Sequence, residues 1–141
     1  MWRPSIIASE LRVNTLKDAS GNNSIPTSFV ANGSAKARGQ HAAGTLQSGS
    51  LNHSSITDHA TGSFSHNFTN SFANTVYSHV GSATYNAGSS SAIWTYMRED
   101  GSSGDTATGS IKVTSAFILS SQNRTDYDFA FVDLICFGDL A

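Results

Sequence analysis

The sequence is poor in charged residues of either sign. Eight Lys and Arg face ten Asp and Glu, and together they make up 13% of the 141 residues, against about 25% in an average soluble domain. No basic run occurs, whereas proteins that bind nucleic acid neutralise the phosphate backbone with clustered cations. We therefore expect no nucleic-acid partner.

Cysteine and long apolar runs are also scarce. The single cysteine, Cys136, excludes an intramolecular disulfide and a cysteine-based zinc cage. It lies in the apolar run at residues 131–137, which predicts an inert, buried thiol. No stretch approaches the roughly 18 apolar residues of a membrane span, and residues 1–9 are too short an apolar run for a signal peptide. We expect no membrane insertion, and synthesis and folding in a cytoplasm.

Small polar residues take the place of charge. Ser, Thr, Asn and Gly account for 59 of the 141 residues, while Leu, Ile, Val and Phe number only 29. Such thin apolar content approaches that of disordered chains, but those chains also carry a high net charge. The net charge here is −2, so the composition favours one folded domain with a modest core.

Alternating apolar and polar residues recur in short segments separated by Gly, Ser, Asn and Asp turns. This pattern predicts an all-β fold, an antiparallel β-sandwich or barrel without helices. The polar stretch at residues 39–50 is expected to be irregular loop. The last predicted strand is apolar on both faces, which is typical of a central strand. The predicted strands are residues 62–68, 75–81, 91–98, 109–118 and 127–137.

One further strand is predicted near the N-terminus, at residues 10–16, where Leu11 and Val13 alternate with polar residues. A dense turn cluster follows at residues 18–24. No second strand is apparent nearby, so this one is expected to dock on the later domain, to pair with copies of itself, or to bind another protein. We predict an N-terminal segment at residues 1–33 that anchors the chain in one of these ways, and a β-sandwich domain, the head, at residues 35–141.

The residue types that often carry catalysis are present without the spacing that catalysis needs. No Gly-x-Ser-x-Gly elbow or P-loop occurs, and the adjacent Glu99 and Asp100 abut a Gly-rich turn, unlike a pair of carboxylates across a cleft. Five histidines show no His-x-His or His-x3-His spacing, and we interpret them as polar or half-buried sheet residues. Whether one histidine repeated around a three-fold axis binds a metal is left open. We predict no enzyme, no catalytic or metal site and no cofactor. The histidines are His41, His53, His59, His66 and His79.

A second candidate site lies on the predicted strand at residues 91–98. Trp94, Tyr96 and Arg98 are two residues apart and share one strand face. If exposed, these side chains would suit a receptor or interface contact, either by sugar stacking or by contact with a protein. We favour core packing of the two aromatics, because a Ser-rich domain needs its large side chains inside.

Two long segments resemble the fibre proteins of tailed bacteriophages, especially marine and cyanobacterial phages. Residues 9–22, SELRVNTLKDASGN, are similar to an N-terminal repeat in which a short strand leads into a Gly/Asn turn. Residues 50–74, SLNHSSITDHATGSFSHNFTNSFAN, resemble the Ser-Ile-Thr-Asp and Asn-Phe-Thr pattern of the fibres' C-terminal domain. Tyr77, the turn at residues 80–83 and the closing LICFGD at residues 134–139 continue the similarity in order.

Two positions depart from the family pattern. Arg38 stands where the family usually has tryptophan, and Ala60 replaces a common glycine. The missing tryptophan changes the expected packing of the early strand.

The resemblance implies a homotrimeric virion fibre protein, made in the host cytoplasm and mounted on the particle. Residues Leu11, Val13 and Leu16 would then trimerise or bind a tail, portal or capsid protein, and the head would attach to a host surface glycan or protein. A tail fibre that attaches to the host is the first interpretation. A capsid-mounted head fibre or decoration protein is the second, and a freestanding carbohydrate-binding β-sandwich is the third.

Overall fold

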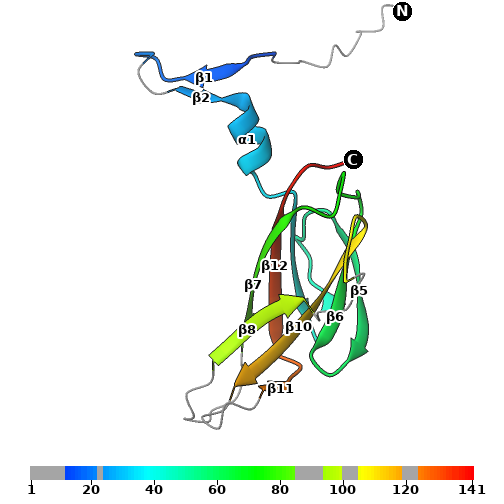
Figure 1. Cartoon of the computed structure of the whole chain (residues 1–141). Coiled ribbons are helices and arrows are strands. Elements are labelled where there is room, and N and C mark those ends of the chain that lie inside the picture. The colour runs from blue at the N-terminus through cyan, green and yellow to red at the C-terminus, as the bar shows by residue number, and fades with distance from the viewer. Residues whose placement is uncertain (1–11, 22–23, 85–93, 100–104, 119–123) are drawn as a thin grey trace, which may run out of the picture. The chain divides into compact units, whose positions relative to one another are not determined.

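The structure, a computed structural model, describes residues 12–21, 24–84, 94–99, 105–118 and 124–141, with the backbone alone for residues 94–99, 117 and 118. The chain forms two compact units, Met1–Ser34 and Ala35–Ala141 (Figure 1). We call them unit 1 and unit 2 and describe each by itself.

Unit 1 is a small hairpin followed by one helix. Strand β1 (Thr15–Lys17) pairs antiparallel with β2 (Ser24–Pro26), with Leu16 opposite Ile25. The predicted strand at residues 10–16 was therefore placed too early and was wrongly expected to lack a nearby partner. Strand β2 could not be predicted from the sequence, because its three residues are too few to show apolar alternation.

Helix α1 (Thr27–Gly33) contradicts the expectation of a helix-free chain. It starts directly after Pro26, whose φ of −57° leads readily into a helix. The Thr27 hydroxyl donates to the Val13 carbonyl at 3.0 Å, which ties the first turn back to the chain before β1. Seven residues are fewer than two full turns, so no apolar stripe could reveal the helix in the sequence.

Unit 2 consists of two antiparallel sheets. The first has the order β4-β3-β12-β7, and in the second β10 pairs with β6, β8, β9 and β11 while β5 pairs with β6. Across the described residues of both units, strands hold 56% and helix 7%, so the all-β expectation is confirmed. The first sheet comprises β3 (Ala37–Ala42), β4 (Thr45–Leu46), β7 (Ser78–Thr84) and β12 (Phe131–Phe137). The second comprises β5 (His53–Ala60), β6 (Ser63–Phe68), β8 (Trp94–Glu99), β9 (Thr106–Ala107), β10 (Ser110–Ile118) and β11 (Arg124–Asp126).

Strands β6 and β10 lie where the sequence predicts them, whereas β7 begins and ends three residues later than the predicted strand at residues 75–81. In β6 the inward residues are Phe64, His66 and Phe68, as the alternation indicates.

Strand β12 is central between β3 and β7, as predicted. Its apolar run suggested cover on both faces, but only the face with Val132, Leu134 and Cys136 is buried, and Phe131 on the other face is 41% exposed. The strand was predicted to begin at residue 127, but residues 127–130 lie before β12, so β12 is shorter than predicted.

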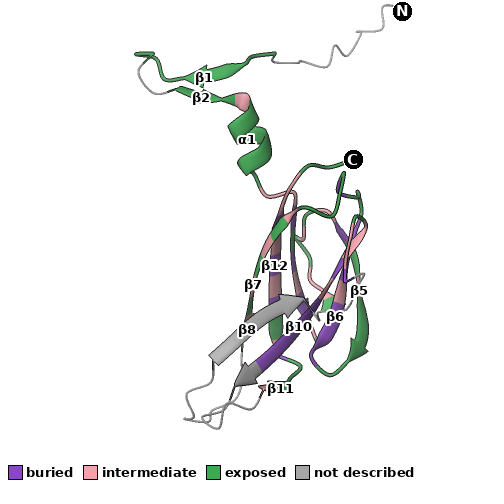
Figure 2. Ribbon diagram, in the orientation of Figure 1, coloured by how far each residue is buried: buried purple, intermediate pink, exposed green. Residues whose placement is uncertain are grey.

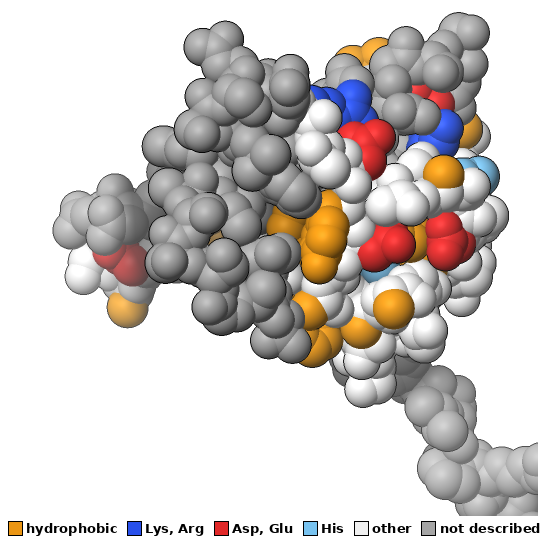
Figure 3. All heavy atoms as spheres, turned by 90° about the horizontal axis from the view of Figure 1, so that it is seen from below, with side chains coloured by type: hydrophobic (Ala, Val, Ile, Leu, Met, Phe, Trp, Pro, Cys, Tyr) orange, Lys and Arg blue, Asp and Glu red, His pale blue; other side chains and the backbone are white. Residues whose placement is uncertain are grey.

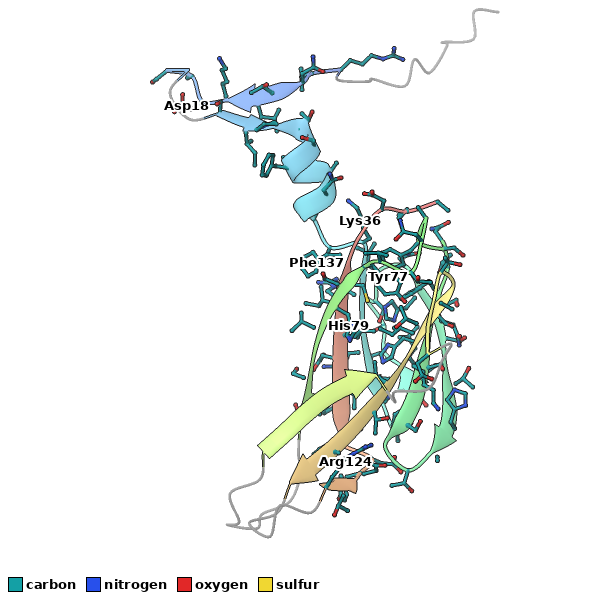
Figure 4. The ribbon with its side chains drawn as sticks, viewed as in Figure 1. Asp18, Lys36, Tyr77, His79, Arg124 and Phe137 are labelled. Atoms are coloured by element: carbon teal, nitrogen blue, oxygen red, sulfur yellow. The ribbon has the colours of Figure 1, made fainter. Side chains whose placement is uncertain are left out.

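The buried faces of the two sheets meet through large side chains. The ring of His41 on β3 lies 4.4 Å from that of Phe64 on β6, centroid to centroid, and so connects the two sheets. Nearer one end, Phe72 stacks on Tyr77 at 4.3 Å, and the Tyr77 hydroxyl donates to the Ala107 carbonyl at 3.0 Å (Figure 4). Buried residues therefore line the inner sides of both sheets (Figure 2).

Two longer polar strands of unit 2, β3 and β5, were not predicted, and neither were the short strands β4, β9 and β11. Strand β3, ARGQHA, occupies part of the expected loop at residues 39–50, and β5 follows shortly after it. The inward residues of β3 are Ala37, Gly39 and His41, which give no hydrophobic alternation. Gly39 is required there because a Cβ atom would overlap the His53 ring.

The hairpin between β5 and β6 is fitted against β10 at Gly62. The φ of Gly62 is +71°. A Cβ atom added to Gly62 would collide with the Ser115 carbonyl oxygen and lie 2.7 Å from the Tyr127 nitrogen. The amide of Ser115 donates to the Gly62 carbonyl at 2.7 Å, and the Gly62 amide donates to the Asp128 carboxylate. The position needs glycine both for its backbone conformation and for space.

The substitution Gly62→Ala should therefore destabilise unit 2 by about 2 to 4 kcal/mol, the combined effect of a left-handed backbone and a clash with rigid main chain. Gly49→Ala is the matched control, because Gly49 has a φ of +85° but open space around it, and should lose only about 1 kcal/mol. Urea denaturation would measure both. Equal losses would show that backbone strain alone accounts for the effect.

Candidate functional site

Two of the three predicted anchoring residues are described by the structure, and both are exposed apolar residues of unit 1. Leu11 falls outside the described residues, whereas the Val13 and Leu16 side chains are 39% and 40% exposed. The hairpin and helix add further exposed apolar side chains, and no residue in the described part of unit 1 is buried (Figure 2). We call this set the unit 1 apolar surface: Val13, Leu16, Ile25, Phe29 and Val30.

Such a unit has little to stabilise it internally. A two-stranded hairpin is marginal in water, and an isolated helix of seven residues is well below the length that is stable alone. Burial of the unit 1 apolar surface against another chain would supply the missing hydrophobic free energy. The surface is therefore the strongest candidate for an interaction site in unit 1.

The second predicted site, Trp94, Tyr96 and Arg98, lies on β8. The backbone of β8 pairs with β10 so that these residues stand opposite Ile118, Ala116 and Thr114. Their side chains are outside the described part of the structure. The choice between core packing and an exposed contact stays a prediction.

Three of the five histidines form a buried cluster between the sheets of unit 2. His41 comes from β3, His53 from β5 and His66 from β6. The His66 ring lies 5.2 Å from the His41 ring and 5.1 Å from the His53 ring, centroid to centroid. The Nδ1 atoms of His53 and His66 are 3.3 Å apart, at hydrogen-bond distance. His41 Nδ1 accepts from the Gly44 amide at 3.3 Å, so the proton of this neutral imidazole is on Nε2.

Burial favours the neutral form of all three imidazoles. Desolvation lowers the pKa of His53 to about 4. Desolvation, with smaller effects of charge on His53 and His41, lowers the pKa of His66 to about 2. Desolvation also lowers the pKa of His41, and Asp133, Asp58 and Asp128 partly oppose it. At neutral pH the cluster is thus an uncharged, aromatic part of the core.

The arrangement does not form a metal site. The Nε2 atoms of all three rings are buried without a hydrogen-bond partner, yet no group of three or more His, Cys, Asp or Glu in the described ranges is placed to hold a metal ion.

Cys136 is fully buried, and burial raises the pKa of its thiol to about 12. This confirms the prediction of a buried thiol and leaves it almost entirely protonated at neutral pH.

Sequence reasoning missed the cluster because its members come from three strands in two different sheets. His66 alone carried a local signal, through its alternation with Phe64 and Phe68. The strands that hold His41 and His53 were not predicted, so nothing in the spacing could bring these residues together.

No protein-family model, curated protein or solved structure matches the chain. Among the described residues, no helix has the length and apolar character needed to cross a membrane.

The histidine cluster should make unit 2 sensitive to acid. Because the folded pKa values lie below the unfolded value of 6.5, the unfolded chain binds more protons, and stability is lost as the pH falls from 6.5 toward 4. Each neutral histidine contributes up to about 1.4 kcal/mol per pH unit. Between pH 6 and pH 5 we expect a loss of about 2 to 4 kcal/mol, measured by urea denaturation.

The substitution His66→Leu tests whether the buried histidines cause this acid sensitivity. The readout is the slope of the unfolding free energy against pH, which a simple packing defect would not alter. Below pH 6.5 the slope should decrease by the amount that corresponds to one proton fewer taken up on unfolding. Val113→Ala is the control, because it makes a packing defect in the same core without removing a titratable group, and should keep the wild-type slope. An unchanged slope in His66→Leu would refute the role of the cluster.

Proposed function

We propose that the chain is a structural fibre protein of a tailed-bacteriophage virion. Unit 1 joins three copies and attaches them to another virion protein, and unit 2 is displayed outward as a β-sandwich head. The sequence resemblance supplies the class of protein. The observation that supports separate roles for the two units is a contrast in burial. The described residues of unit 1 are all exposed or half-buried, whereas unit 2 has its own core.

The unit 1 apolar surface supports the anchoring role. Residues from the chain before β1, from both strands and from α1 contribute to it, so one partner could bury side chains from the whole unit. Three equivalent copies related by rotation would cover these side chains with the same residues of their neighbours, as closed symmetric assemblies do. The resemblance is what implies three copies.

Unit 2 suits the role of a displayed head. Two antiparallel sheets packed through aromatic rings form a support for surface contacts. Hydrophobic, acidic and basic side chains lie close together on the face seen in Figure 3. A tail fibre that attaches to the host is the leading assignment, and a capsid-mounted head fibre is the alternative.

Light scattering of the purified full chain should give a particle of three times the 14.9 kDa chain mass. Leu16→Asp should release monomers, because it places a charge on the unit 1 apolar surface. Thr15→Asp is the matched control, since successive side chains of a strand point to opposite faces, and should remain trimeric. A monomeric wild-type chain at micromolar concentration would overturn the trimer.

Immunogold electron microscopy of phage particles tests the location directly. The wild-type protein should decorate either the tail or the capsid, which separates the two fibre assignments. A chain shortened to residues 35–141 should fold but be absent from particles. Incorporation of the shortened chain at the wild-type level would show that unit 1 does not anchor it.

A further inference from the structure

A groove of about 600 Å³ lies on the outer side of the sheet β4-β3-β12-β7, the side that faces away from the histidine cluster. Strands β3, β12 and β7 contribute to it, and the loop at residues 47–50 forms one wall. The polar side chains that line it come from separate parts of the chain: Arg38, Gln40, Gln47, Ser48, Ser82 and Asp133.

The loop wall is held to β3 by several hydrogen bonds. The backbones of Arg38 and Leu51 exchange two hydrogen bonds, of 2.9 and 2.7 Å. The Arg38 guanidinium donates to the Gly49 carbonyl at 3.0 Å, and the Ser50 hydroxyl donates to the Gln47 carbonyl at 2.9 Å. The groove is therefore formed before any ligand arrives.

Asp133 lies at the centre of the polar side chains. It stands opposite Gln40 on β3 and opposite Ser82 on β7. The Gln40 amide donates to one carboxylate oxygen at 2.8 Å, and the Ser82 hydroxyl donates to the other at 3.3 Å. A carboxylate offers about four acceptor positions, so Asp133 is held in one orientation and keeps acceptor capacity for a ligand.

The chemistry of the lining identifies the class of ligand. One cation, Arg38, and one anion, Asp133, leave the groove without net charge, which disfavours phosphate and other strong anions. Side-chain amide and hydroxyl groups line the groove together with an aliphatic residue, Ile135. Hydroxyl groups of a sugar both donate and accept, and its C–H faces suit an aliphatic surface.

We propose that this groove binds a saccharide through its ring hydroxyl groups. Asp133 accepts from ligand hydroxyls, and the remaining N–H groups of Arg38 and Gln40 donate to them. The proposal rests on the proposed function and deepens it, because it names a ligand class and a site for the head. The groove itself is formed by unit 2 alone.

Nuclear magnetic resonance of the full, ¹⁵N-labelled chain tests the site. Methyl β-glucopyranoside, methyl β-galactopyranoside and N-acetylglucosamine would be titrated separately. At least one should shift the backbone amides of Gln40, Ser82 and Asp133 in a saturable way, with a millimolar Kd expected of a single sugar ring in an open groove. Unmoved groove amides with all three sugars, or shifts confined to another surface, would overturn the proposal.

Asp133→Asn keeps the shape of the side chain but removes its charge, and should weaken binding about tenfold, as expected for loss of a charge-assisted hydrogen bond. Asp58→Asn is the matched control, since Asp58 is an exposed carboxylate on β5 in the other sheet, and should bind as the wild type does. Wild-type affinity in Asp133→Asn would contradict the site.

Arg38→Lys serves as a second variant should Asp133→Asn fail to fold. Arg38 is exposed, and lysine keeps its charge but lacks the planar fork of donors. We expect weaker sugar binding with an unchanged melting temperature. Unchanged sugar affinity of Arg38→Lys would contradict the proposed sugar site in the groove.

Trimer mass and incorporation into virions are measured without sugar. A failure of the sugar-binding proposal is therefore distinguishable from a failure of the fibre assignment.

Discussion

Packing between the two sheets of unit 2 is the constraint on which the rest of the molecule depends. The chain has few large aliphatic side chains, so the space between the sheets is filled mainly by rings. Phe68 packs edge to face on Phe72 at 5.0 Å, and His41 and Phe64 make contact between the two sheets. Aromatic rings bury a large area each and interlock at defined angles, which compensates for the small number of apolar residues.

Use of histidine as a core ring makes the fold depend on its protonation state. The buried imidazoles pack as aromatic groups only while they are neutral, because a charged ring at their positions would be desolvated without a partner close enough to compensate. Close approach of the sheets also requires small neighbours. Gly39 leaves room for His53 where any side chain would displace the ring.

The surfaces of the two units differ in kind, and the difference supports separate roles. Unit 1 exposes apolar side chains that water solvates poorly, so it gains stability by association. On unit 2, the outer face of the sheet containing β12 holds a fixed set of donors and acceptors around Asp133. Such a surface gains little from non-specific burial and is suited to directional contacts with a polar ligand.

The sequence alone determined the all-β class, the positions of β6 and β10 and the central place of β12, because alternation and a two-faced apolar run are local properties of a strand. It could not indicate β3, whose inward residues are small or polar, or α1, which is too short to show a stripe. Only the tertiary structure brought His41, His53 and His66 together and placed Arg38 near Asp133. These groupings form across strands distant in the chain, where pairing register decides which side chains meet.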